Sequence, residues 1–321
     1  MRSWFMNTEG GGSRLELRDV AMPAPGPGQL LLKVRAAGLN RGEFIIGHGL
    51  TKAGTAKALG IEAAGEVVEG GSERFPPGTR VMARIPGGMS EYVVVNEAEA
   101  IHVPDALSWE QAAAIPTTYM VAHDMIVLQG QLPNGGWALV TGASSGVSVA
   151  AMQIAKALGG KVIGTSGSDD KLKRLKELGL DVPICTRQPD FYQAVMDATG
   201  GAGVNVVVNA VGGSVFAECV RCLAYEGRLA TVGYVDNQLK AEIDLQALHA
   251  KRLVLFGVSN KMVGAAQKAE ATAAFALEIV PHIAAGRIRP VLDQVFPFEQ
   301  LPAARERMEA NAHLGKIVIT L

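Results

Sequence analysis

Between residues 137 and 258, short apolar segments alternate with amphipathic ones, and this alternation restricts the fold more than any other feature of the chain. Four segments have the length and β-branched content of buried strands: Trp137–Thr141, Lys161–Thr165, Val204–Asn209 and Arg228–Val232. Three segments between or beside them have helical periodicity: Val149–Leu158, Lys171–Leu178 and Val215–Ala224. Strands that alternate with helices form βαβ units. The sequence therefore predicts an α/β fold with a doubly wound parallel sheet.

The region before residue 119 has the pattern of an antiparallel β domain. Its expected strands are short and are separated by Pro and Gly: Arg14–Val20, Gln29–Ala37, Ala64–Val68, Arg80–Ala83 and Glu91–Val95. Ser108 and Gln111 have the spacing of a capping box and predict the start of a helix. After an Ala-rich helix expected near Ala265–Ala285, the Pro-punctuated tail resembles this region more than the central one. We therefore expect one domain of residues 1–118, completed by 263–321, and a second of residues 119–262.

Composition and charge exclude several classes of protein. Of the 321 residues, 48% are hydrophobic and 19% are charged, which is typical of a globular chain. The net charge of -1 provides no long-range field for nucleic acid or an anionic membrane. Cys185, Cys219 and Cys222 form no disulfide framework and indicate a reducing compartment. With no signal peptide and no apolar run near the roughly 20 residues of a membrane helix, we expect a cytoplasmic protein that acts on a small molecule.

The segment Leu139–Ser148 is the most specific candidate site. It lies between an apolar strand and a helix, where the unpaired amides of a helix N-terminus bind a dinucleotide's diphosphate. Ser144, Ser145, Gly146 and Val147 are the residues expected to contact it. Only Gly146 is a glycine among the core fingerprint positions, so a plain strand-to-helix turn is the alternative interpretation.

The end of the next strand indicates which dinucleotide binds. An NAD-specific site has Asp or Glu there for the ribose hydroxyls, whereas this chain has Ser166, followed by Ser168 and Lys171. A small polar group and a cation suit a 2′-phosphate, so the expected cofactor is NADP(H). In the alternative interpretation Lys171 is a solvated lysine, and the neighbouring Asp169 and Asp170 weaken the local positive potential.

Ordered motifs run through nearly the whole chain: Ala37–Asn40, Gly60–Val67, Pro77–Val81, Ser90–Tyr92, Ala112–Pro116, Val162–Ser168 and Gly315–Val318. Together they resemble the zinc-independent quinone oxidoreductases of the medium-chain dehydrogenase/reductase superfamily. The resemblance implies a GroES-like catalytic domain that the tail completes, with a Rossmann domain inserted between its parts. It also implies a homodimer and an active-site cleft shaped by residues 44–50 and 258–263.

The resemblance further implies where the cofactor is contacted. Asn209, Ala210 and Val211 end one strand of the predicted parallel sheet, and Gly233 and Tyr234 end the next. Their backbones are expected to contact the nicotinamide and its ribose. Relatives often have a phosphate-side Tyr where Thr186 stands, and Arg187 beside it would supply charge instead.

Two residues are candidates for the reaction itself. Asn40 is expected to donate a hydrogen bond to the substrate oxygen or the nicotinamide. The equal alternative is that Asn40 holds the loop after Leu39. Tyr119 is a candidate proton donor, although a buried Tyr with a satisfied hydroxyl is the commoner state.

Zinc alcohol dehydrogenases of the same superfamily place metal ligands where this chain has Asn40, Ile61 and the segment Pro116–Tyr119. Catalytic zinc needs about three protein ligands, so no metal is expected here. A quinone or an α,β-unsaturated carbonyl spreads the charge of an incoming hydride by conjugation and does not require a Lewis acid. The predicted activity is NADPH-dependent reduction of such acceptors. The alternatives are a non-catalytic NADPH-binding or sensing protein and, more remotely, a zinc alcohol dehydrogenase.

Overall fold

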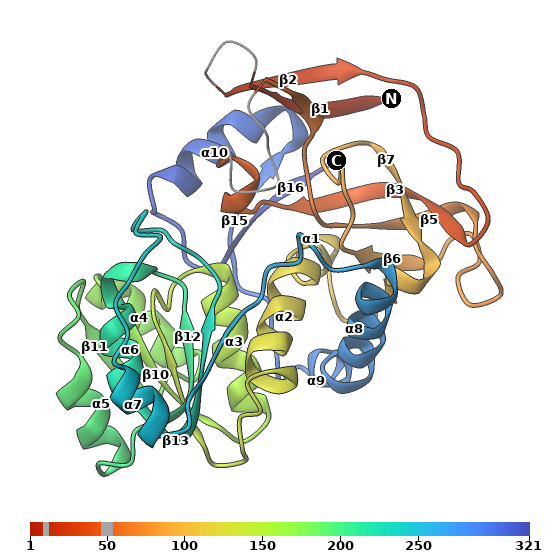
Figure 1. Cartoon of the computed structure of the whole chain (residues 1–321). Coiled ribbons are helices and arrows are strands. Elements are labelled where there is room, and N and C mark those ends of the chain that lie inside the picture. Colours follow the sequence, from red (N-terminus) through yellow and green to blue (C-terminus); the bar gives the residue numbers. More distant parts are fainter. Residues whose placement is uncertain (9–12, 46–53) are drawn as a thin grey trace. The chain divides into compact units, whose positions relative to one another are not determined.

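The computed structural model describes residues 1–8, 13–45 and 54–321, which form two compact units (Figure 1). The first unit contains Met1–Met120, Lys261–Ala285 and Pro290–Leu321, and the second contains Val121–Asn260 and Gly286–Arg289. Each unit has its own apolar core. In the described part of the chain, no helix is both long and apolar enough to span a membrane.

The main sheet of the first unit consists largely of antiparallel strands, as predicted. Its order is β15 (Leu292–Pro297), β16 (Lys316–Thr320), β3 (Gln29–Gly38), β5 (Ala63–Gly70), β6 (Arg80–Ala83) and β8 (Ala100–His102), with β7 (Tyr92–Asn96) also paired to β3. Among these strands only β15 and β16 pair in parallel. A smaller sheet has the order β2 (Arg14–Asp19), β1 (Arg2–Asn7) and β4 (Ala56–Ala58). The sequence patterns did not predict β1, β4, β8 or β15.

C-terminal segments pack into the first unit. Val318 of β16 lies opposite Gly38 of β3, and α10 (Leu301–Glu309) packs against β15 and β16. Trp4 Nε1 donates a hydrogen bond to Phe298 O at 2.9 Å. The single helix expected over 265–285 is instead two, α8 (Ala265–Glu278) and α9 (Val280–Ala284). The break falls before Pro281 because proline has no N–H to continue the hydrogen-bond ladder.

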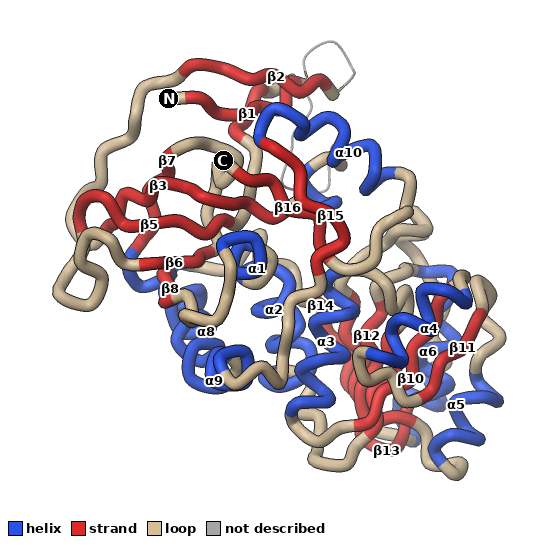
Figure 2. The backbone as a smooth tube through the Cα atoms, turned by 180° about the vertical axis from the view of Figure 1, so that it is seen from behind, coloured by secondary structure: helices blue, strands red, loops and turns tan. Residues whose placement is uncertain are grey.

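The second unit contains the predicted parallel sheet, with helices around it (Figure 2). Its order is β11 (Val182–Cys185), β10 (Lys161–Ser166), β9 (Trp137–Val140), β12 (Val204–Asn209), β13 (Leu223–Thr231) and β14 (Val254–Gly257), and all five pairings are parallel. The chain winds outward from β9 in one direction and from β12 in the other. Ligands bind beyond the carboxyl ends of strands at such a switch point.

The helices of the second unit differ from the prediction at their ends. They are α3 (Gly146–Ala157), α4 (Asp169–Glu177), α5 (Tyr192–Thr199), α6 (Phe216–Cys222) and α7 (Leu245–Ala250). Helix α3 begins before the predicted Val149 because Ser145 caps it. The helix expected to reach Ala224 ends at Cys222, because β13 begins there to pair with β12. Strand β11 and helices α5 and α7 were not predicted.

Two short helices connect the β-rich part of the chain to the parallel sheet. Helix α1 (Trp109–Ala113) begins at the predicted capping box, in which Ser108 Oγ accepts a hydrogen bond from Gln111 N at 3.2 Å. Helix α2 (Pro116–His123) follows it and continues into a π-helical turn over Asp124–Leu128. A single helical turn, Arg41–Glu43, follows β3 and starts the polar site described below.

Candidate active site

The turn between β9 and α3 has the backbone of an anion-binding loop. Ser145 Oγ caps α3 by accepting a hydrogen bond from Ser148 N at 3.3 Å. The buried Ser148 hydroxyl donates to Thr141 O at 3.2 Å, so this residue ties the helix to the end of the strand. Gly146 and Val147 are in the first helical turn, whose amides have no intrahelical acceptor. These amides fit a diphosphate group.

Strand β10 lies directly against this turn. Ala143 N donates a hydrogen bond to Thr165 O at 2.9 Å. A side chain at Gly164 would place its Cβ 3.0 Å from the Cβ of Ala143. Because glycine occupies this position, the turn packs closely on the strand without displacing Ala143.

The structure brings the predicted 2′-phosphate residues together at the end of β10. Ser166 Oγ accepts a hydrogen bond from Ser168 N at 3.3 Å, and Ser168 Oγ caps α4 by accepting from Lys171 N at 3.4 Å. The exposed Arg187 lies across Gly167, where an added Cβ would be 2.3 Å from Arg187 Nε. Two hydroxyls and the Arg187 side chain therefore lie near the position where an NAD-specific site has a carboxylate, and Lys171 is in the first turn of the adjacent helix.

At the end of β12, the Asn209 side chain holds the backbone of the following loop. Its Oδ1 accepts from Val211 N and Gly212 N, both at 3.1 Å, and its Nδ2 donates to Gly212 O at 2.9 Å. The neighbouring loop is close, because Val232 N donates to Asn209 O at 3.0 Å. Any cofactor contact at this edge would come from main-chain atoms near Ala210 and Val211 rather than from the Asn209 amide.

The sequence analysis missed Asp236, which joins the loops after β12 and β13. Its Oδ2 accepts from Ser214 N at 2.8 Å and Ser214 Oγ at 2.5 Å, and its Oδ1 accepts from Gln238 N at 2.9 Å. A side chain at Gly212 would lie only 2.0 Å from Asp236 Oδ1. These hydrogen bonds lower the pKa of Asp236 against the opposing effect of its burial. No local motif indicated this role, because the partners come from two different loops.

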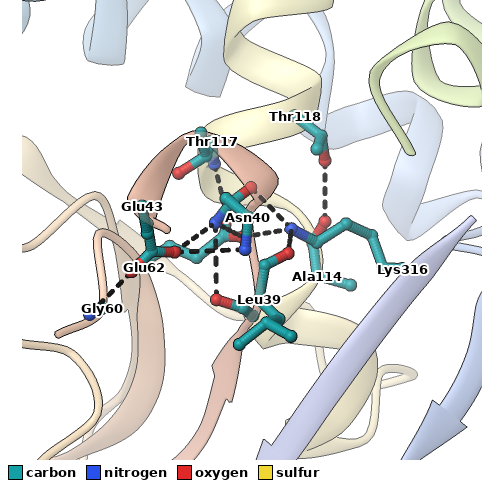
Figure 3. A network of polar contacts seen from close by, with 10 residues as sticks. Leu39, Asn40, Glu43, Gly60, Glu62, Ala114, Thr117, Thr118 and Lys316 are labelled. Atoms are coloured by element: carbon teal, nitrogen blue, oxygen red, sulfur yellow. Dashed lines mark hydrogen bonds and ion pairs between the residues drawn. The ribbon is translucent and has the colours of Figure 1, made fainter. Parts of the chain in front are cut away.

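The first unit contains a buried polar cluster around Lys316 (Figure 3). Lys316 Nζ donates to Leu39 O at 2.8 Å, Asn40 Oδ1 at 2.8 Å and Glu62 Oε1 at 2.6 Å, which uses all three ammonium protons. Glu62 is fully buried, and its Oε2 accepts from Thr117 N at 2.7 Å at the start of α2. The ion pair thus joins β16, the loop after β3 and α2.

Asn40 and Glu43 extend this cluster toward Gly60. Asn40 Nδ2 donates to Glu62 Oε1 at 2.9 Å and to Glu43 Oε1 at 3.2 Å. Glu43 Oε1 also accepts from Asn40 N at 3.1 Å, and its Oε2 accepts from Gly60 N at 2.8 Å (Figure 3). The Asn40 amide is therefore fully engaged within the chain, as in the loop-holding alternative. Burial raises the pKa of Glu43 to about 7.

Tyr119 and Thr117 lie on α2 beside the cluster. Tyr119 is 2% exposed, and burial raises its pKa well above the usual value, so its hydroxyl stays protonated at neutral pH. Thr117 Oγ1 is buried without a hydrogen-bond partner. The sequence analysis did not single out Thr117. Of the residues expected to shape the cleft, 46–50 lie outside the described part of the chain.

Two family models match the chain. The alcohol dehydrogenase GroES-like domain matches residues 26–105, and the zinc-binding dehydrogenase domain matches residues 146–276. The human synaptic vesicle membrane protein VAT-1 homolog is 31% identical over 95% of this chain and 82% of its own length. Highly reducing polyketide synthases of Purpureocillium lilacinum and Cordyceps militaris are 29% and 30% identical, but the chain spans only 14% and 12% of their lengths.

Solved structures resemble the whole chain. A mycobacterial protein, Rv1454c, solved in complex with NADPH, superimposes with a TM-score of 0.88 at 26% identity over 100% of both chains. The quinone oxidoreductase of Pseudomonas syringae pv. tomato DC3000 superimposes with a TM-score of 0.87 at 27% identity, also over 100% of both chains.

The donor set at the zinc position does not fit a zinc ion. Asn40 is bonded to Lys316 and two carboxylates, and Ile61 offers no donor atom. Over residues 1–8, 13–45 and 54–321, no group of three or more His, Cys, Asp or Glu side chains is placed to hold a metal. Cys219 and Cys222 are buried in α6 within the apolar core of the second unit.

Proposed function

Because the chain belongs to the medium-chain dehydrogenase/reductase superfamily, in its quinone oxidoreductase-like branch, we propose that it is an NADPH-dependent reductase of quinones or α,β-unsaturated carbonyl compounds. In this proposal the second unit binds the cofactor and the first unit binds the substrate. The side chains at the zinc position are unsuited to a metal, and an acceptor that conjugation activates fits best because it does not require a Lewis acid.

The residues at the end of β10 are the observation that supports NADPH, rather than NADH, as the cofactor. Arg187 lies over Gly167, next to the hydroxyls of Ser166 and Ser168, and Lys171 is in the first turn of α4. A charge-assisted contact contributes about 1.5 to 3 kcal/mol. One such contact with the 2′-phosphate corresponds to a preference for NADPH over NADH of roughly 10- to 150-fold.

The chemistry divides between the cofactor and the protein. NADPH, when bound, supplies a hydride. Ser145, Gly146 and Val147 would hold its diphosphate through the start of α3, and main-chain atoms of Ala210 and Val211 would orient its nicotinamide end. Asn40, with its amide already engaged, would act by keeping Glu43 and Glu62 in place. Tyr119 as a proton donor remains a prediction.

The proposal is tested by NADPH oxidation with a panel of quinones and enones, followed at 340 nm. We expect Lys171→Ala and Arg187→Ala each to raise the KM for NADPH by roughly 10-fold or more while leaving that for NADH within about 2-fold. Lys173→Ala is the matched control, because Lys173 is an exposed lysine of the same helix whose partner is Asp170. If both cofactors respond equally to all three substitutions, the 2′-phosphate site is refuted.

The alternatives predict different results. A non-catalytic NADPH-binding or sensing protein would bind NADPH saturably without turning over any member of the panel. A zinc alcohol dehydrogenase would contain one tightly bound zinc per chain by metal analysis.

A further inference from the structure

The loop Ala210–Gly212, which follows β12, uses all but one of its main-chain polar groups within the chain. Ala210 N donates a hydrogen bond to Thr141 Oγ1 at 3.1 Å, and the next two amides both donate to Asn209 Oδ1. Val211 O accepts at 3.1 Å from a main-chain N–H of the loop after β13, and Gly212 O accepts from the Asn209 amide. Among the residues that the structure describes, none donates a hydrogen bond to Ala210 O. This carbonyl oxygen is therefore the main-chain group of the loop that remains for a ligand.

The ligand group that fits Ala210 O is a hydrogen-bond donor, because a carbonyl oxygen only accepts. Ala210 directly follows the carboxyl end of β12, and ligands bind at that end of a parallel sheet. An added Cβ at Gly233 would lie 3.4 Å from this oxygen, and glycine leaves that space free. The nicotinamide riboside end of NADPH has suitable donors in its carboxamide and in its ribose hydroxyls.

Asp236 holds this loop against the loop that follows β13. Its Oδ2 accepts from Ser214 N at 2.8 Å and from Ser214 Oγ at 2.5 Å, and its Oδ1 accepts from Gln238 N at 2.9 Å. The N–H group that bonds to Val211 O is that of Asp236 itself. Gly213 N also donates to Gln238 O at 3.0 Å. Because Asp236 bonds to both loops, the backbone beside Ala210 O depends on its carboxylate.

Gly212 allows the carboxylate to come this close to the loop. Its φ of 132° lies in a region that residues with a side chain rarely adopt. An added Cβ would also lie only 2.0 Å from Asp236 Oδ1. Any side chain at this position would therefore displace the carboxylate or the loop. The glycine and the aspartate together fix the backbone that directly follows Ala210 and Val211.

We propose that Asp236 is a positioning residue for the nicotinamide riboside end of NADPH. It fixes the loop after β12 so that Ala210 O accepts a hydrogen bond from the carboxamide or from a ribose hydroxyl of that end. Asp236 acts through the loop and not through a contact of its own with the cofactor. This inference rests on the proposed function and deepens it, because it assigns the residue that aligns the reactive half of the cofactor.

Calorimetric titration with two ligands tests this role. NADPH has both halves of the cofactor, whereas 2′,5′-ADP has the adenosine and its 2′-phosphate but no nicotinamide. We expect Asp236→Ala to raise the Kd for NADPH about 10-fold and to leave that for 2′,5′-ADP within about 2-fold. In turnover, its kcat should fall by about 100-fold because the nicotinamide is misplaced.

Two further variants sharpen the test. Asp236→Asn retains one oxygen that can accept from Ser214, but its amide nitrogen cannot accept from Gln238 N. It should therefore recover part of the affinity for NADPH and part of kcat. Asp244→Ala is the matched control, because Asp244 is an exposed aspartate of the segment after β13 that caps α7. This variant should bind both ligands as the wild type does.

The outcomes separate this inference from the proposed function. If Asp236→Ala weakens the binding of both ligands equally, Asp236 has only a general structural role and the inference is overturned. Unchanged affinity for NADPH overturns it as well and leaves the reductase intact. A wild-type protein that binds neither ligand overturns both the inference and the proposed function. Should Asp236→Ala fail to fold, Asp236→Asn decides, and a Kd for NADPH equal to that of the wild type then overturns the inference.

Discussion

The burial of Glu43 makes the stability of the fold depend on pH. The pKa of Glu43 is raised from 4.5 to about 7 in the folded protein by its burial. The folded chain therefore binds this proton more tightly than the unfolded chain does. The stabilisation is complete below pH 4.5 and is lost as the pH rises through 7. As the pH rises from 5 to 8, deprotonation of this one group lowers the free energy of unfolding by about 2.5 kcal/mol.

The measurement is urea unfolding of the wild-type protein and Glu43→Gln at pH 5, 6, 7 and 8. All of these proteins carry Trp137→Phe, because Trp137 is in the second unit. The tryptophan emission that reports unfolding then comes from Trp4 and Trp109, both in the first unit. We expect the wild type to lose about 2.5 kcal/mol more than Glu43→Gln across this range. Glu73→Gln is the matched control, because Glu73 is exposed in a turn, and it should follow the wild type. Parallel curves for the wild type and Glu43→Gln would refute the reasoning, because they would mean that Glu43 has the same pKa in both states.

Further substitutions test the buried contacts. Lys316→Met should cost about 3 to 5 kcal/mol in urea unfolding by removing the ammonium that contacts Glu62 Oε1 at 2.6 Å, and adding Glu62→Gln should recover part of this; additive costs would argue against the ion pair. Gly38→Ala should destabilise the first unit by roughly 1 to 3 kcal/mol or more, because its Cβ would lie 2.3 Å from Glu62 Oε1; an unchanged urea midpoint would contradict this. Asp236→Ala should weaken NADPH binding in calorimetry without unfolding the protein, and unaltered affinity would exclude a positioning role. The exposed edge of β14 should pair across a twofold axis, so sedimentation should show a dimer, and a monomer at all concentrations would refute that assembly.

Local sequence patterns predicted an element correctly where all the residues that specify it lie in one segment. The apolar segments around Leu139 and Val207 identified central strands of the parallel sheet, because strands buried on both faces must be apolar throughout. Ser108 and Gln111 located a helix start because both capping partners lie within one turn. Strand β1 was missed, although Trp4 and Met6 are buried in the core, because its three apolar residues are consecutive and do not alternate with polar ones.

By itself, the sequence determined the α/β class, the turn of small residues between β9 and α3, and the group of small and basic residues after β10, since each depends on neighbours along the chain. Only the tertiary structure decided that Lys316 pairs with Glu62, that Glu43 is buried beside Gly60, and that the Asn40 amide bonds to both carboxylates. Lys316 and Glu62 are 254 positions apart. No periodicity or spacing specifies such a contact, because it forms only when the sheet brings β16 beside β3.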